Sequence, residues 1–109
     1  MRKAAIVTFA LVLGLGPLAA AAADADAGKK KAGEVCQACH GLDGNSPSPE
    51  FPKIGGQHRD YLAKALRDYK SGARKNAIMA GFAGALSRQD IDNLSAWYAM
   101  QARVVHMKR

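Results

Sequence analysis

Cysteine is scarce in this chain of 109 residues, and the only two cysteines stand together in Cys36-Gln37-Ala38-Cys39. A structural zinc site needs about four nitrogen or sulfur ligands, and no second cysteine pair is present to complete one. A disulfide across so small a loop would add little stability. The pair is therefore expected to serve chemistry or a cofactor.

Strand patterns are also missing, because no stretch alternates apolar and polar residues with a period of two. Apolar residues recur instead at helical spacing, as in Tyr61, Leu62, Ala65 and Leu66. We predict an all-α domain of three to four short helices and two long loops. The helices are expected at residues 25–37, 57–71 and about 87–103, the last with a Ser87–Asp90 capping box, and the loops at 40–57 and 73–86.

Acidic residues are few. Lys and Arg number 16 against 9 Asp and Glu, which gives a net charge of +7. The basic residues are scattered, and aromatic residues are not interleaved with them, so nucleic acid is not the expected partner. A protein partner with an acidic docking surface fits better, although a basic surface can also serve solubility alone.

The first 23 residues have the layout of a secretory signal peptide. A basic start is followed by an apolar stretch to residue 18 and by small residues up to Ala23. The other interpretation is a retained membrane anchor, because residues 4–23 are just long enough to cross a bilayer, although Gly16-Pro17 would disturb such a helix.

We expect cleavage after Ala23, with cuts after Ala25 or Ala27 as alternatives. Residues 24–109 then form one exported domain of 86 residues, which for a bacterial chain means the periplasm. Loss of Arg2 and Lys3 leaves 14 basic against 9 acidic residues, a net charge of about +5.

Residues 36–40 read Cys-x-x-Cys-His, the pattern of covalent haem attachment. Two thiols three positions apart on a turning backbone can each form a thioether with a haem vinyl group. The next residue can then place its imidazole beneath the iron. A small chain needs such a cofactor to fill its interior, which also explains the long loops. We predict one haem c on Cys36 and Cys39, with His40 as proximal ligand.

A thioredoxin-like redox pair is the main rival interpretation of the two cysteines. Such a pair is expected at the start of a helix that follows a strand. Here no strand is predicted and the motif follows a helix, so a thiol–disulfide oxidoreductase is less well supported than a haem protein.

The chain resembles the class I c-type cytochromes, in particular the small bacterial monohaem proteins and single halves of the dihaem ones. The likeness runs in the family's order over nearly all of the mature chain. It is carried by residues 36–46, 51–57, 61–62, 76–79 and 86–91. The resemblance implies the class I cytochrome c fold, in which helices and loops wrap around one covalent haem.

The resemblance also implies roles for three further residues. Met79 occupies the place of the family's distal iron ligand, and Gly81 and Gly84 nearby would let the backbone approach the porphyrin. The carbonyl of Pro52 would orient His40, and Ile54 would pack on the haem face. Val35 and Leu66 are further candidates for the wall, and His58, Met100, His106 and Met107 are weaker candidates for the distal ligand.

One position departs from the family pattern. The family pairs its first and last helices through a small residue and an aromatic one, but here Gly28 and Ala32 hold those places. The aromatic is therefore missing, and Trp97 or Tyr98 is expected to fill the gap.

Occupation of both axial positions by His40 and Met79 would leave no open site for substrate. The expected function is that of an electron carrier rather than an enzyme, acting between redox partners such as a membrane reductase or a terminal oxidase. The alternative of another class is a gas sensor or peroxidase-like enzyme, which needs an open sixth position.

Overall fold

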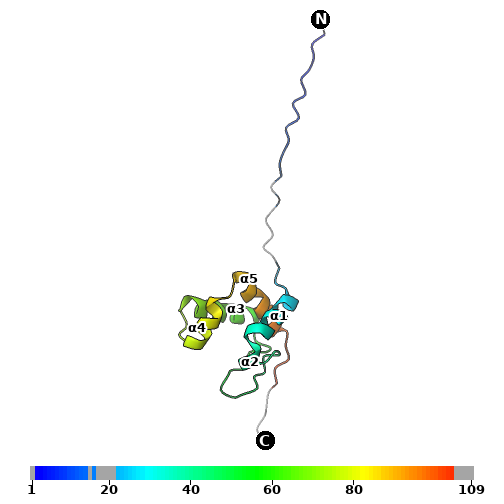
Figure 1. The fold of residues 1–109 in the computed structure, drawn as a ribbon. Coiled ribbons are helices and arrows are strands. Elements are labelled where there is room, and N and C mark those ends of the chain that lie inside the picture. The colour runs from blue at the N-terminus through cyan, green and yellow to red at the C-terminus, as the bar shows by residue number, and fades with distance from the viewer. Residues whose placement is uncertain (1, 15, 17–21, 105–109) are drawn as a thin grey trace.

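The computed structural model describes residues 2–14, 16 and 22–104, and every regular element in that part of the chain is a helix. In chain order these are α1 (Ala25–Val35), α2 (Gln37–His40), α3 (Arg59–Ser71), α4 (Ala77–Gly84) and α5 (Arg88–Ala99), as Figure 1 shows. The predicted all-α fold is confirmed. Among the described residues, no helix has the length and apolar character that a membrane crossing requires.

Helix α5 is the centre of the core, and α1 and α3 pack against it. The core side chains of α5 are buried almost completely, with Leu94 1% and Tyr98 3% exposed. α3 contributes Leu62, which is also buried. α4 packs on α3, so it lies on the opposite side of the molecule from α1 (Figure 1).

The crossing of α1 and α5 requires glycine at position 28. A Cβ on Gly28 would lie 2.0 Å from the carbonyl oxygen of Asn93, so any side chain would push the two helices apart. Ala32, one turn later, is fully buried. The expected aromatic comes from α5, since Trp97 lies beside Gly28 and its ring is 5.4 Å from the Lys29 ammonium group.

The prediction that residues 73–86 form a loop is wrong, because α4 lies within them. Asn76 caps this helix, and its side-chain oxygen accepts a hydrogen bond from the Met79 amide at 3.0 Å. Gly81 and Gly84 had suggested a loop. In the structure they are helical, and apart from the surrounding turns of α4 itself, no atom of the described residues lies within 4 Å of the Cβ that either would carry.

The last helix is shorter than predicted, ending at Ala99 instead of near Arg103. The chain beyond it is held by Asn45, whose amide donates to the carbonyl of Ala102 at 2.9 Å and accepts from the amide of Val104 at 2.8 Å. These backbone groups are bound to a distant loop and are not available to continue the helix.

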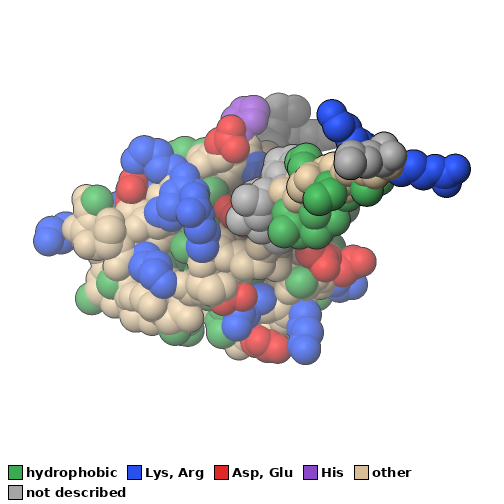
Figure 2. Space-filling model, turned by 90° about the horizontal axis from the view of Figure 1, so that it is seen from above, with side chains coloured by type: hydrophobic (Ala, Val, Ile, Leu, Met, Phe, Trp, Pro, Cys, Tyr) green, Lys and Arg blue, Asp and Glu red, His purple; other side chains and the backbone are tan. Residues whose placement is uncertain are grey.

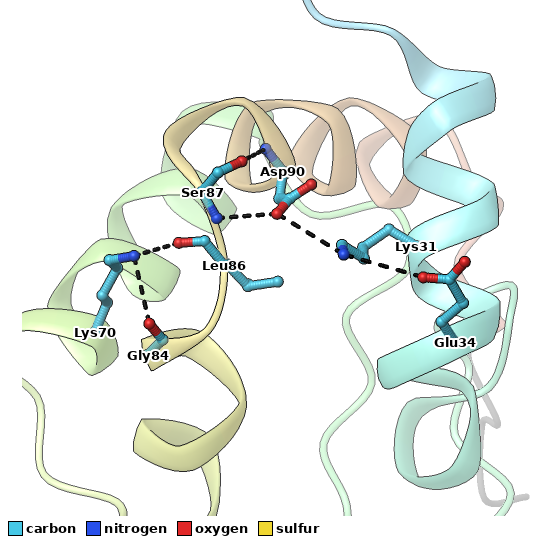
Figure 3. A network of polar contacts seen from close by, with 7 residues as sticks. All are labelled: Lys31, Glu34, Lys70, Gly84, Leu86, Ser87 and Asp90. Carbon is cyan, nitrogen blue, oxygen red and sulfur yellow. Dashed lines mark hydrogen bonds and ion pairs between the residues drawn. The ribbon is translucent and has the colours of Figure 1, made fainter.

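A polar network joins four of the helices (Figure 3). Lys70 of α3 donates to the carbonyl of Leu86 and holds the corner between α4 and α5. The predicted capping box of Ser87 and Asp90 is present at the start of α5. Asp90 also lies 3.9 Å from the ammonium group of Lys31, which links α5 to α1.

Candidate haem site

The Cys-x-x-Cys-His motif forms a single helical turn. Cys36 precedes α2, and its carbonyl accepts hydrogen bonds from the amides of Cys39 and His40 at 3.3 and 3.0 Å. Residues three and four positions apart lie on one face of a helix, so both thiols and the imidazole are brought together by local structure alone. Gly41 then leaves the helix with a φ of 77°, a conformation that favours glycine.

The orientation of the buried His40 ring is set by Pro52, 12 residues further along the chain. Its Nδ1 lies 2.8 Å from the carbonyl oxygen of Pro52. A proline carbonyl can only accept, so Nδ1 carries the proton and Nε2 holds the free lone pair that a metal ligand needs. In the described part of the chain, Nε2 has no hydrogen-bond partner, and the imidazole borders a cavity.

Two neighbouring aromatic residues of α5 hold the backbone that follows His40. The indole of Trp97 donates to the carbonyl of Leu42 at 2.8 Å, and the hydroxyl of Tyr98 donates to the carbonyl of Gly41 at 3.0 Å. Because α5 is the most buried helix, these two bonds tie the motif to the core.

Two adjoining cavities of about 200 Å³ and 180 Å³ lie against the motif. The first is bounded by α3 and α5, with Ile54, Leu62 and Leu94 among its walls. The second is bounded by α1 and α4, with Val35 and Phe82 among its walls. In the part of the chain that the structure describes, six residues border both cavities: Cys36, His40, Pro52, Leu66, Tyr69 and Met79.

Met79 lines both cavities from α4, a different helix from the one that carries the motif. It occupies the third position of α4, where the Asn76 cap fixes its backbone. The structure thus brings together Cys36, Cys39, His40, Pro52, Ile54 and Met79 around the same space.

Two of the weaker candidates for the distal ligand, Met100 and His58, border neither cavity. Met100 is 65% exposed at the end of α5, and His58 is exposed at the start of α3. His106 and Met107 lie outside the described residues. Tyr61, Tyr69, Arg74 and Tyr98 also line the first cavity, although the sequence had not indicated a role for them there.

Burial governs the chemistry of the free thiol at position 36. It raises the pKa of Cys36 to about 11, so before attachment the thiol is protonated at neutral pH. Burial likewise raises the pKa of Tyr98, with the nearby Cys36 as a second cause, which keeps the phenol as a hydrogen-bond donor. Both cysteines are free, with partly exposed side chains.

The residues around the cavities fit haem c. The two thiols are spaced for the two vinyl groups, the Nε2 lone pair is free, and a thioether borders the same space. The surrounding walls are largely apolar, as the faces of a porphyrin require.

Comparisons with known proteins agree with this site. Residues 25–99 match the family model for cytochrome c. Cytochrome c4 of Pseudomonas aeruginosa is 49% identical over 102 residues, which cover 94% of this chain and 50% of that protein. Cytochrome c-554(548) of Halomonas halodenitrificans is 41% identical over 83 residues, which cover 73% of this chain and 99% of that protein.

A solved structure shows the same fold. The crystal structure of reduced recombinant cytochrome c4 from Pseudomonas stutzeri superposes with a TM-score of 0.71 and 44% identity. The match covers 77% of this chain and 48% of that one. The chain therefore spans about half the length of its cytochrome c4 relatives.

The match over most of the chain confirms three predictions: the resemblance to class I cytochromes, the fold and one covalently bound haem c as cofactor. By its sequence, its fold and the geometry of its Cys-x-x-Cys-His turn, the chain belongs to the cytochrome c family.

Proposed function

We propose that this protein is a periplasmic electron carrier that passes single electrons between redox proteins. The observation that carries the proposal is the convergence of His40 and Met79, from different helices, on one apolar space beside Cys36. Haem c bound there would supply a one-electron ferric/ferrous couple. Residues 1–23 are proposed to be a cleaved signal peptide, and residues 24–109 the functional domain.

Each residue of the site is proposed to hold one part of the cofactor. Cys36 and Cys39 would form the two thioethers, and His40 would ligate the iron through Nε2 while Pro52 keeps its ring in place. Met79 would ligate the other face through its thioether, and Ile54 would cover the porphyrin. With both axial positions filled by the chain, electrons rather than atoms are exchanged with the partner.

The visible absorption spectrum of the oxidised and reduced protein tests this proposal. We expect a low-spin ferric spectrum with a weak iron–sulfur band near the red edge of the visible range, the mark of Met ligation. A high-spin ferric spectrum would instead indicate an open sixth position and support a gas sensor or peroxidase-like enzyme. A colourless protein would point to a thiol–disulfide oxidoreductase.

The partner is proposed to be a membrane reductase or a terminal oxidase with an acidic docking surface. Figure 2 shows Lys and Arg side chains spread over the face seen from above, with Asp and Glu between them. Two basic residues are proposed to act near the cofactor. Lys53 lines the first cavity, and Lys75 directly precedes Asn76, which caps α4 and lines the second cavity.

If these charges steer association, the association rate should fall about tenfold or more as salt rises from low to physiological ionic strength. Stopped-flow mixing with an acidic redox partner measures this rate. Lys53→Glu and Lys75→Glu should each slow association, while dissociation changes little. Lys30→Glu on α1 is the control, because it makes the same charge change away from the cavities. An association rate that does not depend on salt would contradict steering.

A further inference from the structure

Arg74 stands out because its charge has no obvious use in the fold. Its side chain lines the first cavity, beyond the C-terminal end of α3. Among the described residues, ion pairs within 4.0 Å join Lys31 to Glu34 and Asp90, and Lys64 to Asp68, so Arg74 has no carboxylate partner. An exposed arginine needs none, but this guanidinium is held in position.

Three contacts fix the place of Arg74. Its backbone amide donates to the carbonyl of Asp68 at 3.0 Å, which folds the turn after α3 back onto the helix. Its guanidinium donates to the Tyr61 hydroxyl at 3.5 Å and stacks over the ring of Tyr69, 4.8 Å from the centroid. Both tyrosines line the same cavity, so the positive charge is placed at its rim.

The charges around the two cavities differ in sign. Among the described residues, the first cavity has Arg74 and Lys53 on its wall and no Asp or Glu. The described wall of the second cavity has Glu50 and no Lys or Arg. An anionic group that enters this space is therefore attracted to the rim of the first cavity and repelled from that of the second.

Haem has two anionic groups, its propionates, on the half of the macrocycle opposite the vinyl groups. The attachment motif would place the vinyl side at Cys36 and Cys39, and Cys39 borders the second cavity but not the first. The carboxylates of a haem bound in this way would lie away from Cys39, toward the cationic rim of the first cavity. A guanidinium matches a carboxylate through two parallel N–H donors, which an ammonium group cannot provide.

We infer that Arg74, positioned by Tyr61 and Tyr69, is the counter-cation of a haem propionate. This inference rests on the proposed haem site and adds to it a residue that recognises the charged edge of the cofactor. Lys53 is less suited to this role, since its ammonium group already donates to the carbonyl of Val104 at 2.9 Å.

The reduction potential as a function of pH tests the inference, with Arg74→Gln compared with Arg67→Gln. Both variants lose one positive charge from the same stretch of chain. Arg67 is exposed on α3 and lines neither cavity. In the haem-loaded protein Cys36, Cys39 and His40 would be bonded to the cofactor. The remaining titratable groups at the cavities (Glu50, Lys53, Tyr61, Tyr69 and Tyr98) are the same in both proteins, so their contributions cancel in the comparison.

Arg74→Gln should lower the potential at neutral pH more than Arg67→Gln does, because an unpaired propionate stabilises the ferric charge. It should also raise the pKa of that propionate, so the potential climbs as pH falls, whereas Arg67→Gln stays as flat as the wild type. Arg74→Lys should restore most of the wild-type potential. Redox-induced infrared difference spectra should show a shifted carboxylate band in Arg74→Gln only.

Different results would overturn the role of Arg74 and the proposed haem function. Haem-loaded Arg74→Gln that matches Arg67→Gln in potential, pH profile and infrared spectrum would overturn the role of Arg74 and leave the haem site intact. A wild-type protein without covalent haem would overturn both. The low-spin spectrum should be unchanged in every variant, because none replaces an iron ligand.

Discussion

Replacing Met79 by alanine should open the sixth coordination position and produce the largest change in potential of any single substitution. The weak iron–sulfur band should disappear and the ferric spectrum should become high-spin, or change to that of a replacement ligand such as a lysine. The potential should fall by a sizeable part of the roughly 0.8 V range that axial ligands span, because a thioether favours ferrous iron. Visible spectroscopy and a redox titration measure both effects.

Met100→Ala is the matched control for this substitution. Met100 is 65% exposed and borders neither cavity, so its loss should alter neither the spectrum nor the potential. If Met79→Ala leaves both unchanged, Met79 is not the ligand, and His58→Ala and Met100→Ala become the decisive variants.

The second large effect is expected at the attachment turn. Cys36→Ser and Cys39→Ser should each remove one thioether, and most of the coloured protein should be lost. The physical reason is that a serine hydroxyl does not add to a vinyl group as a thiol does. Acid–acetone extraction of the wild type should leave the colour with the protein, because thioethers do not dissociate, and the double variant should lose any remaining haem to the solvent.

Gln37→Ala is the control, since it lies between the cysteines, is exposed and preserves their spacing. It should give wild-type amounts of coloured protein. Colour that passes into the solvent from the wild type would contradict covalent attachment, whatever the variants do. His40→Ala should abolish the low-spin spectrum even where the thioethers form.

The parts of this protein that could be predicted from sequence depend on contacts a few residues apart. Cys36, Cys39 and His40 fall on one helical turn, so their spacing alone predicts that they act together. The capping box of Ser87 and Asp90 is equally local and appears where it was predicted. The roles of Met79 and Pro52 were predicted only through the resemblance to a family, since nothing in their own neighbourhood identifies them.

Predictions from local sequence were wrong in the segment around Met79, where some residues favoured a loop and others favoured a helix. Gly81 and Gly84 indicated a loop around Met79, but the Asn76 cap and the contact with α3 produced a helix. Glycine weakens a helix by about 1 kcal/mol relative to alanine, which tertiary packing can outweigh. The same limit applies at the end of α5, where hydrogen bonds to Asn45 stop a helix that its own residues would have continued.

The sequence by itself therefore determined the chemistry of this protein: two thiols and an imidazole on one turn, in an all-helical chain of the cytochrome c family. Only the tertiary structure decided how that turn is held and what surrounds it. The bonds from Trp97 and Tyr98 to the backbone just after the motif span 55 and 57 residues, and Arg74 at the rim of the first cavity contacts Tyr61 and Tyr69 of α3. Such contacts depend on the path of the whole chain, because the energy that places them comes from packing between helices and not from any local pattern.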